Sequence, residues 1–529
     1  MESNQQNQRI LVKFNTYYDS VTLLAVSQRL QSMRGVEAAL VAMATPLNLA
    51  VLESLEFASN VQAGSNDLLL AVRGSDVLSV ENALEQAETM LRGGVKQPLN
   101  GQVAGQAAGQ VTGQALPKSL GRALAENVAN LALISVPGQF AAREARQALA
   151  KGLHVLLFSD NVALADEVAL KQYAHKQGLL LMGPDCGTAI INGVPLAFAN
   201  AVRRGSIGIV GASGTGIQEV SVQIDRLGQG ISQALGTGGR DLSREVGGIM
   251  LLDGIEALRN DPDTTVLVVI SKPAAPEVAA KVLTALERCG KPAVYCVLGD
   301  DVEAPSHATV RRAKTLLAAA QMAVEAAGGA LEGESREDGL ALKSIKGLSY
   351  GPKYVRGLFS GGTLGDEAML ILGEQLGLIY SNTPLAPEAK LGDPGKSREH
   401  TVLDLGDDYF TQGRAHPMLD CTLRRARIVQ EARDPQTAVI LLDVVLGYGS
   451  HPDPAEELAP AIRKAREIAL NDGRKIIFVA YVCGTQRDPQ DYARQVNTLQ
   501  QAGAAVFASN VAAAQFAAQV AKALQGGAR

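Results

Sequence analysis

Short apolar runs alternate with amphipathic stretches along most of this sequence. From residue 130 onward, each apolar run is followed by a segment whose apolar positions lie three and four residues apart, the spacing of one helix face. Strands alternating with helices in this way predict parallel sheets covered by helices, which is an α/β fold. The expected strands span 131–136, 154–158, 179–183, 206–211, 266–271, 293–298, 354–362, 400–406, 438–447, 475–482 and 504–509.

The same pattern divides the chain into units. The first opens with a strand at 9–13, a helix at 20–30 and two further strands at 38–43 and 68–72. A repeated Gly-Gln phrase without periodicity then predicts a flexible linker, and a second linker is rich in Gly, Glu, Ser and Lys. The expected division is 1–94 (an N-terminal α/β unit), 95–118 (a linker), 119–204, 205–330, 331–350 (a linker) and 351–529.

Composition narrows the class of protein. Hydrophobic residues make up 47% of the chain but aromatic residues only 4%, so Ala, Val, Leu and Ile must fill the cores. A net charge of −5 gives no reason to expect nucleic acid or an anionic membrane as a partner. The five cysteines are scattered, which is typical of reduced thiols, and no apolar run is long enough to cross a bilayer. We therefore expect a cytoplasmic protein.

Two strand-to-helix junctions have the composition of an anion site. In each, glycines and hydroxyl residues follow an apolar strand and open a helix, whose free N–H groups and dipole favour a phosphate or carboxylate. An equal alternative is that the hydroxyls only cap their helices. Neither junction is a Walker A loop or a dinucleotide fingerprint. The candidate residues are Ser213, Gly214, Thr215, Gly216, Ser360, Gly361, Gly362 and Thr363.

A third candidate site follows the expected strand at 179–183. Gly183, Pro184, Asp185 and Cys186 come where ligands bind at the carboxyl edge of an open α/β sheet. Cys186 could be a nucleophile, but the sequence offers it no basic partner. A small buried side chain is the favoured interpretation of this cysteine.

Taken in order, these phrases resemble the succinyl-CoA synthetase superfamily. The phrases are SVPG (135–138), LMGPDCG (181–187), IVGASGTGIQE, the GTGG loop and LFSGGTL. The resemblance implies a CoA-binding Rossmann-like domain followed by two flavodoxin-like succinyl-CoA-synthetase-type domains, an α-subunit joined to the C-terminal domain of a β-subunit. The pocket residues that it implies for the substrate or CoA are Pro137, Gly183, Pro184, Asp185, Cys186, Gly238 and Gly239.

Longer phrases resemble the FdrA family within this superfamily. They are KFNTYYDSVTLL (13–24), VAMATPLNLAVLE (41–53), GRAHPMLD (413–420) and VVLGYGSHPDPA (444–455). This resemblance implies a subunit of an oxamate carbamoyltransferase of allantoin and purine catabolism, with carbamoyl phosphate as the substrate and other protein subunits as partners.

Two departures from the superfamily limit the expected chemistry. The synthetases carry a phosphohistidine in a Gly-His-Ala-Gly loop, whereas His307 lies among Pro, Ser and Thr and is interpreted first as a surface or capping residue. The ATP-grasp module is absent between 330 and 351. Three functions stay open: carbamoyl transfer with partner subunits, an acid–CoA ligase whose ATP-grasp half is a separate chain, and a scaffold that binds CoA or an acyl phosphate without catalysis.

Other polar residues have two interpretations each. His416 and His451 precede prolines in polar loops and are either catalytic groups or solvated turn residues. Asp443 lies in an apolar strand, where a carboxylate needs a partner, and is a candidate catalytic residue together with His416 and His307. Asp404, Asp407 and Asp408 either bind Mg²⁺ or form an acidic cap, so no metal site is assigned. CoA also stays open as a cofactor, because the Gly-rich phrase of the superfamily's CoA loop is missing.

Overall fold

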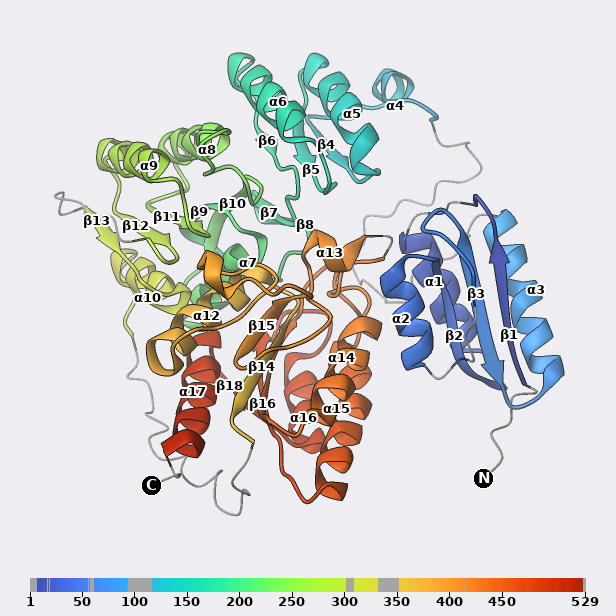
Figure 1. Ribbon diagram of the computed structural model, residues 1–529. Coiled ribbons are helices and arrows are strands. Elements are labelled where there is room, and N and C mark those ends of the chain that lie inside the picture. Colours follow the sequence, from blue (N-terminus) through green and yellow to red (C-terminus); the bar gives the residue numbers. More distant parts are fainter. Residues whose placement is uncertain are drawn as a thin grey trace.

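The computed structural model contains four β-sheets (Figure 1). It describes residues 7–16, 18, 20–55, 57, 61–93, 117–300, 309–331, 352–412 and 414–526. Both expected linkers fall almost wholly outside these residues, and His307 lies outside them as well. Among the described residues, we find no helix with the length and apolar character needed to cross a bilayer.

The N-terminal unit is a three-stranded antiparallel sheet in the order β1-β3-β2. Its two faces are buried separately, because successive side chains of a strand point to opposite faces. Val41 and Leu70 pack under α1 and α3, whereas Leu40 and Leu69 pack against α2. The elements are β1 (Gln8–Lys13), α1 (Ser20–Gln31), β2 (Val36–Met43), α2 (Pro46–Ser54), β3 (Leu68–Gly74) and α3 (Val77–Gly93).

A small parallel sheet, β4-β5-β6, follows. Helices α5 and α6 pack on it, with Ala145, Ala148 and Leu170 buried against Val155 and Leu157. The small alanine side chains let the helices approach the strands closely, so this core is tightly packed without large aromatic residues. The elements are α4 (Leu120–Glu126), β4 (Leu131–Ile134), α5 (Gly138–Ala150), β5 (His154–Leu157), α6 (Leu164–Lys176) and β6 (Leu181–Met182).

The third sheet has seven strands in the order β13-β12-β11-β9-β10-β7-β8. Strands β9 to β13 are parallel, and the hairpin β7–β8 adds an antiparallel edge. Its elements are β7 (Thr188–Ile191), β8 (Val194–Ala197), β9 (Arg204–Ala212), α7 (Gly214–Arg226), β10 (Ile231–Gly236), α8 (Ile249–Asn260), β11 (Val266–Ser271), α9 (Pro276–Cys289), β12 (Ala293–Val297), β13 (Val310–Arg312) and α10 (Leu316–Ala326).

The C-terminal sheet is fully parallel, in the order β15-β14-β16-β17-β18. Helices α14, α15 and α16 cover one face, and α12 and α17 cover the other. Its elements are β14 (Tyr354–Phe359), α12 (Gly362–Leu376), η2 (Pro387–Ala389), β15 (Thr401–Asp404), α13 (Asp408–Thr411), α14 (Thr422–Arg433), β16 (Thr437–Val445), α15 (Pro454–Asn471), β17 (Ile477–Cys483), α16 (Tyr492–Ala502), β18 (Ala504–Phe507) and α17 (Asn510–Gly526).

The seven-stranded and C-terminal sheets share one hydrophobic core. It runs from β9 and α7 through α10 and α12 to α17, so α7 and α12 lie between the two sheets (Figure 1). Arg226 of α7 also donates hydrogen bonds across this boundary to the carbonyls of Val482, Gly484 and Ala508. The α/β class expected from the sequence is confirmed, and each expected strand coincides with or overlaps a strand of the structure.

Candidate functional site

The first turns of α7 and α12 meet face to face between the two large sheets. Each helix follows a central parallel strand, β9 or β14, as the sequence pattern predicted. The Oγ of Ser213 lies 2.6 Å from the Oγ1 of Thr363, which is a hydrogen bond between two domains. A Cβ on Gly361 would lie 2.7 Å from the Cγ2 of Thr215, so only glycine allows this approach. Two positive helix ends therefore converge on one region.

Different groups cap the two helix starts. The Oγ of Ser213 accepts a hydrogen bond from the N–H of Gly216 at 2.9 Å. At α12, the carboxylate of Asp443 accepts from the N–H groups of Ser360 and Gly361, both at 2.8 Å, and from the Ser360 hydroxyl at 3.0 Å. Asp443 is fully buried at the end of β16 and thus holds the loop from beneath. In the described part of the chain, the next N–H groups, those of Gly362 and Thr363, have no acceptor.

A lysine from the other domain lies against the start of α12. Lys272 follows β11, and its Nζ is 3.4 Å from Asp366 and 3.9 Å from Asp404. Burial alone would lower the pKa of Lys272, but Asp366, Asp404 and Asp185 reverse the effect and raise it, so the amine is charged. A Cβ on Gly362 would lie 2.7 Å from this Nζ and 2.3 Å from an oxygen of Asp404. The lysine therefore adds positive charge at this helix start.

Asp404 and Asp366 lie beside that lysine. Burial raises the pKa of Asp404 to about 6, with Lys272 opposing the shift and Asp366 adding to it. The pKa of Asp366 is raised by burial and lowered again in part by Lys272. Within the described residues, no group of three or more His, Cys, Asp or Glu side chains is arranged to hold a metal ion. Asp366 and Asp404 thus form ion pairs with Lys272.

Gly183, Pro184 and Gly238, which the sequence suggested as pocket residues, lie on two loops in direct contact. The Gly183–Pro184 peptide is cis, and Gly238 has φ +88°. A Cβ on Gly238 would lie 2.3 Å from the carbonyl oxygen of Pro184, so the left-handed backbone and the close approach both require glycine there. A Cβ on Gly239 would lie 3.7 Å from an oxygen of the Asp185 carboxylate, an ordinary van der Waals distance.

Asp185 and Cys186 differ sharply in environment. Solvent reaches the Asp185 side chain, yet desolvation by the surrounding loops and the charge of Asp160 raise its pKa to about 7. Cys186 is buried, and its thiol donates to the carbonyls of Gly236 and Thr188 at 3.4 and 3.6 Å. Burial raises the pKa of Cys186 to about 12, so the thiolate needed for nucleophilic attack is not formed near neutral pH.

The two histidines and Pro137 lie in different places. His416 packs on Phe198, and its Nε2 would be 2.7 Å from a Cβ on Gly406, at the edge of the helix-start region. Burial lowers its pKa to about 4, and its Nδ1 accepts from the N–H of Met418, so the neutral ring carries its proton on Nε2. His451 instead lines a cavity beside the N-terminal unit. Pro137 is exposed at the start of α5.

Sequence reasoning missed Lys272 and Arg424. Lys272 had a usable signal, since it directly follows an apolar strand of a parallel sheet. Arg424 had none, because its guanidinium reaches Asp443 at 2.9 Å from a helix on the opposite face of the sheet. A carboxylate in an apolar strand needs a partner, and Arg424 is that partner: its charge neutralises the buried Asp443.

Three family models match parts of the chain. They are described as a CoA-ligase (residues 358–520), an AllF heavy metal-associated domain (6–106) and a CoA binding domain (202–298). Residues 6–106 contain neither cysteine nor histidine, so this chain offers no thiolate or imidazole ligand for a soft metal there. The domain boundaries expected from the sequence stay a prediction.

Relatives include whole-chain and partial matches. The uncharacterized protein YahF of Escherichia coli K12 is 45% identical over 95% of this chain and 96% of its own length. The α subunit of an ADP-forming succinate–CoA ligase from Aquifex aeolicus is 34% identical over 28% of this chain and 49% of that subunit. A dinucleotide-forming acetyl-coenzyme A synthetase structure from Ca. Korarchaeum cryptofilum matches 76% of this chain and 85% of its own, at 17% identity and a TM-score of 0.28.

Proposed function

The chain belongs to the FdrA-type proteins of the succinyl-CoA synthetase superfamily, and from this premise we propose that its paired helix starts bind the phosphoryl group of an acyl phosphate. It is a succinyl-CoA synthetase-like protein with CoA-binding and CoA-ligase domains. The observation that carries the proposal is the 2.6 Å contact between Ser213 and Thr363, which brings two helix N-termini from separate domains to one place.

Charge supports an anionic ligand at this position. Two helix dipoles direct their positive ends at the region, and the Lys272 ammonium beside Gly362 offsets the charge of the neighbouring Asp366 and Asp404 carboxylates. The N–H groups of Gly362 and Thr363 precede the first helical hydrogen bond of α12 and can donate to phosphate oxygens. Asp443 already holds the N–H groups of Ser360 and Gly361, so the ligand would bind beside that carboxylate.

The reaction we propose is carbamoyl transfer between carbamoyl phosphate and oxamate, performed together with other protein subunits. The acceptor nitrogen bonds to the carbonyl carbon while the bond from that carbon to the bridging oxygen breaks. This oxygen leaves with the electron pair as inorganic phosphate, which takes the proton lost by the nitrogen. The helix starts and Lys272 would stabilise the leaving phosphate, and the Nε2–H of His416 would donate to the carbonyl oxygen.

A second candidate is an acid–CoA ligase whose ATP-grasp half is a separate chain. The observations that favour it are the CoA-ligase match over residues 358–520 and the likeness to succinate–CoA ligase α subunits. In that reaction His307 would carry the phosphoryl group, and CoA would be a substrate. ³²P transferred from ATP to His307 when a partner chain is added would favour this ligase over carbamoyl transfer.

Substitution of Gly362 tests the site itself. Gly362→Ala would place a Cβ within 2.7 Å of both the Asp404 carboxylate and Lys272, which displaces the lysine from the helix start. We expect the affinity for carbamoyl phosphate and for phosphate, measured by calorimetry on the full chain, to fall at least about tenfold. Gly373→Ala in the same helix is the matched control, because a Cβ there meets nothing within 4 Å. Equal binding by both variants would overturn the proposed phosphate site.

A further inference from the structure

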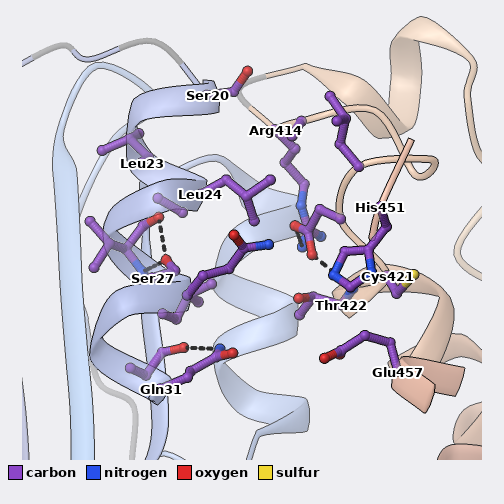
Figure 2. A pocket seen from close by; sticks show the side chains of 18 of the residues that line it. Ser20, Leu23, Leu24, Ser27, Gln31, Arg414, Cys421, Thr422, His451 and Glu457 are labelled. Carbon is purple, nitrogen blue, oxygen red and sulfur yellow. Dashed lines mark hydrogen bonds and ion pairs between the residues drawn. The ribbon is translucent and has the colours of Figure 1, made fainter. Parts of the chain in front are cut away.

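A cavity of about 360 Å³ separates the N-terminal unit from the C-terminal domain. One wall is α1 and the facing strand β2, and the other is formed by residues 414–422 and 451–457. Figure 2 shows Leu24, Ser27 and Gln31 of α1 opposite Arg414 and His451. The cavity thus lies apart from the helix starts and involves none of the residues assigned to phosphate.

Arg414, a charged residue of this wall, has a guanidinium nitrogen that makes no hydrogen bond in the described structure. Its residue is only 8% exposed, and in the described structure its buried Nη1 has no hydrogen-bond partner. The nearest carboxylate, that of Asp420, is 3.7 Å from Nη2, which is too far for a hydrogen bond. Desolvation lowers the pKa of Arg414, and Asp420 offsets this only in part. A buried guanidinium in this condition favours an added acceptor.

The two acidic residues of the cavity are already engaged. Glu457 pairs with Arg425 at 2.8 Å, and Asp420 accepts a hydrogen bond from the N–H of Thr422 at 2.9 Å. Asp420 still forms an ion pair with Arg414, so a bound anion would share the guanidinium with this carboxylate. The Nδ1 of His451 accepts from the N–H of Asp453 at 3.0 Å, so the neutral ring has its proton on Nε2, where it can donate.

We propose that this cavity binds a small carboxylate, whose oxygens Arg414 holds at the junction of the N-terminal unit and the C-terminal domain. A guanidinium binds a carboxylate through two parallel hydrogen bonds, and Arg414 lines the cavity. The cavity is near the lower end of small-molecule sites in volume. Leu23, Leu24 and Leu419 supply apolar contact for a short carbon chain.

The loop that carries Arg414 also reaches the helix starts. His416 lies two residues further on and faces Gly406, whose Cβ position is also close to the carbonyl of Ser360, whereas Arg414 and Asp420 line the cavity. The backbone N–H of His451 donates to the carbonyl of Met418 in the same loop. A carboxylate bound to Arg414 would therefore hold the N-terminal unit, the His416 loop and the His451 loop together.

The test measures binding to the full chain by calorimetry. The probes are acetate, oxalate and succinate, each against sodium chloride at equal ionic strength. We expect one of them to bind to one site, and Arg414→Gln to weaken it at least about tenfold. Arg433→Gln, an exposed arginine on α14, is the matched control and should bind normally. If Arg414→Gln does not fold, Leu24→Glu replaces it as the test variant. Its glutamate, on the opposite wall, brings a negative charge into the cavity and should weaken carboxylate binding to a similar extent.

Two results would overturn the proposal. One is that no probe binds up to about 10 mM, which is weaker than a specific small-molecule site requires. The other is that a probe binds unchanged to Arg414→Gln or Leu24→Glu. Because Gly362→Ala leaves this cavity intact, it should bind the carboxylate normally even where phosphate binding is lost. Loss of phosphate binding at the helix starts and loss of carboxylate binding in this cavity can therefore be told apart.

Discussion

One buried carboxylate organises the start of α12. Asp443 accepts from two backbone N–H groups and the Ser360 hydroxyl, and Arg424, with a side chain 2% exposed, neutralises it from the other face of the sheet. A capping side chain usually comes from the helix's own sequence, whereas this cap comes from a neighbouring strand. The arrangement fixes the loop while leaving Gly362 and Thr363 N–H groups for a ligand.

Two adjacent arginines of α14 provide a test at this scale. Arg424→Gln leaves Asp443 as an uncompensated buried charge, so we expect the free energy of unfolding of the C-terminal domain to fall by about 3–5 kcal/mol. Arg425→Gln is the control, since its pair with Glu457 is well exposed to solvent, and it should cost less than about 1 kcal/mol. Urea unfolding measures both. Similar values for the two variants would show that Arg424 does not neutralise Asp443.

At the scale of elements, α7, α12 and α17 enclose two buried carboxylates. Glu219 of α7 hydrogen-bonds the Tyr481 hydroxyl. Glu367 of α12 accepts from the N–H of Leu316 at 2.7 Å and from the amide of Asn510 at 2.8 Å. These polar contacts connect five elements across the shared core, and they fix which helix faces meet. Burial first, and the charge of Glu219 second, raise the pKa of Glu367 to about 7.

This shift predicts a pH-dependent stability. Because the folded pKa of Glu367 lies above its ordinary value of 4.5, the unfolded chain ionises first as pH rises, and the folded state loses stability up to about pH 7. Glu367→Gln removes the titration. We expect the stability of the variant relative to the parent protein to increase by up to about 3 kcal/mol between pH 4.5 and 7 and to level off above. A difference that does not vary with pH in urea titrations would contradict the raised pKa.

At the scale of the whole molecule, the N-terminal unit has a core distinct from the one that joins the two large sheets. The N-terminal unit has its own two clusters, one on each face of its sheet. The seven-stranded and C-terminal sheets each have a cluster on one face and share a third, which contains Val222 of α7 and Phe359 of β14. Units with independent cores open independently, whereas a shared core couples the elements that it joins.

Hydrogen exchange can separate these units. Leu70→Ala in β3 creates a cavity in the N-terminal unit. We expect the free energy of opening measured by hydrogen exchange to fall by about 2–5 kcal/mol for amides of the N-terminal unit and to stay unchanged elsewhere. Val222→Ala should lower protection in both β9 and β14, since its side chain belongs to the cluster that joins them. Loss of protection confined to one of these two strands would mean that the sheets do not unfold as a unit.

The sequence by itself determined the elements and the two helix-start motifs. Apolar periodicity is a local property, so β9, β14 and the helices after them could be predicted from adjacent residues. The motifs of the superfamily lie in the same short segments, which is why the family could also be identified. Asp443 was found in an apolar strand, but the sequence did not show what its carboxylate holds.

Only the tertiary structure decided which distant groups meet. The pairing of Ser213 with Thr363, the approach of Lys272 to Gly362 and the neutralisation of Asp443 by Arg424 each join residues from different elements. Such contacts depend on the order and relative placement of the sheets, which local periodicity does not encode. The cavity at Arg414 has the same origin, because it exists only where the N-terminal unit packs beside the C-terminal domain.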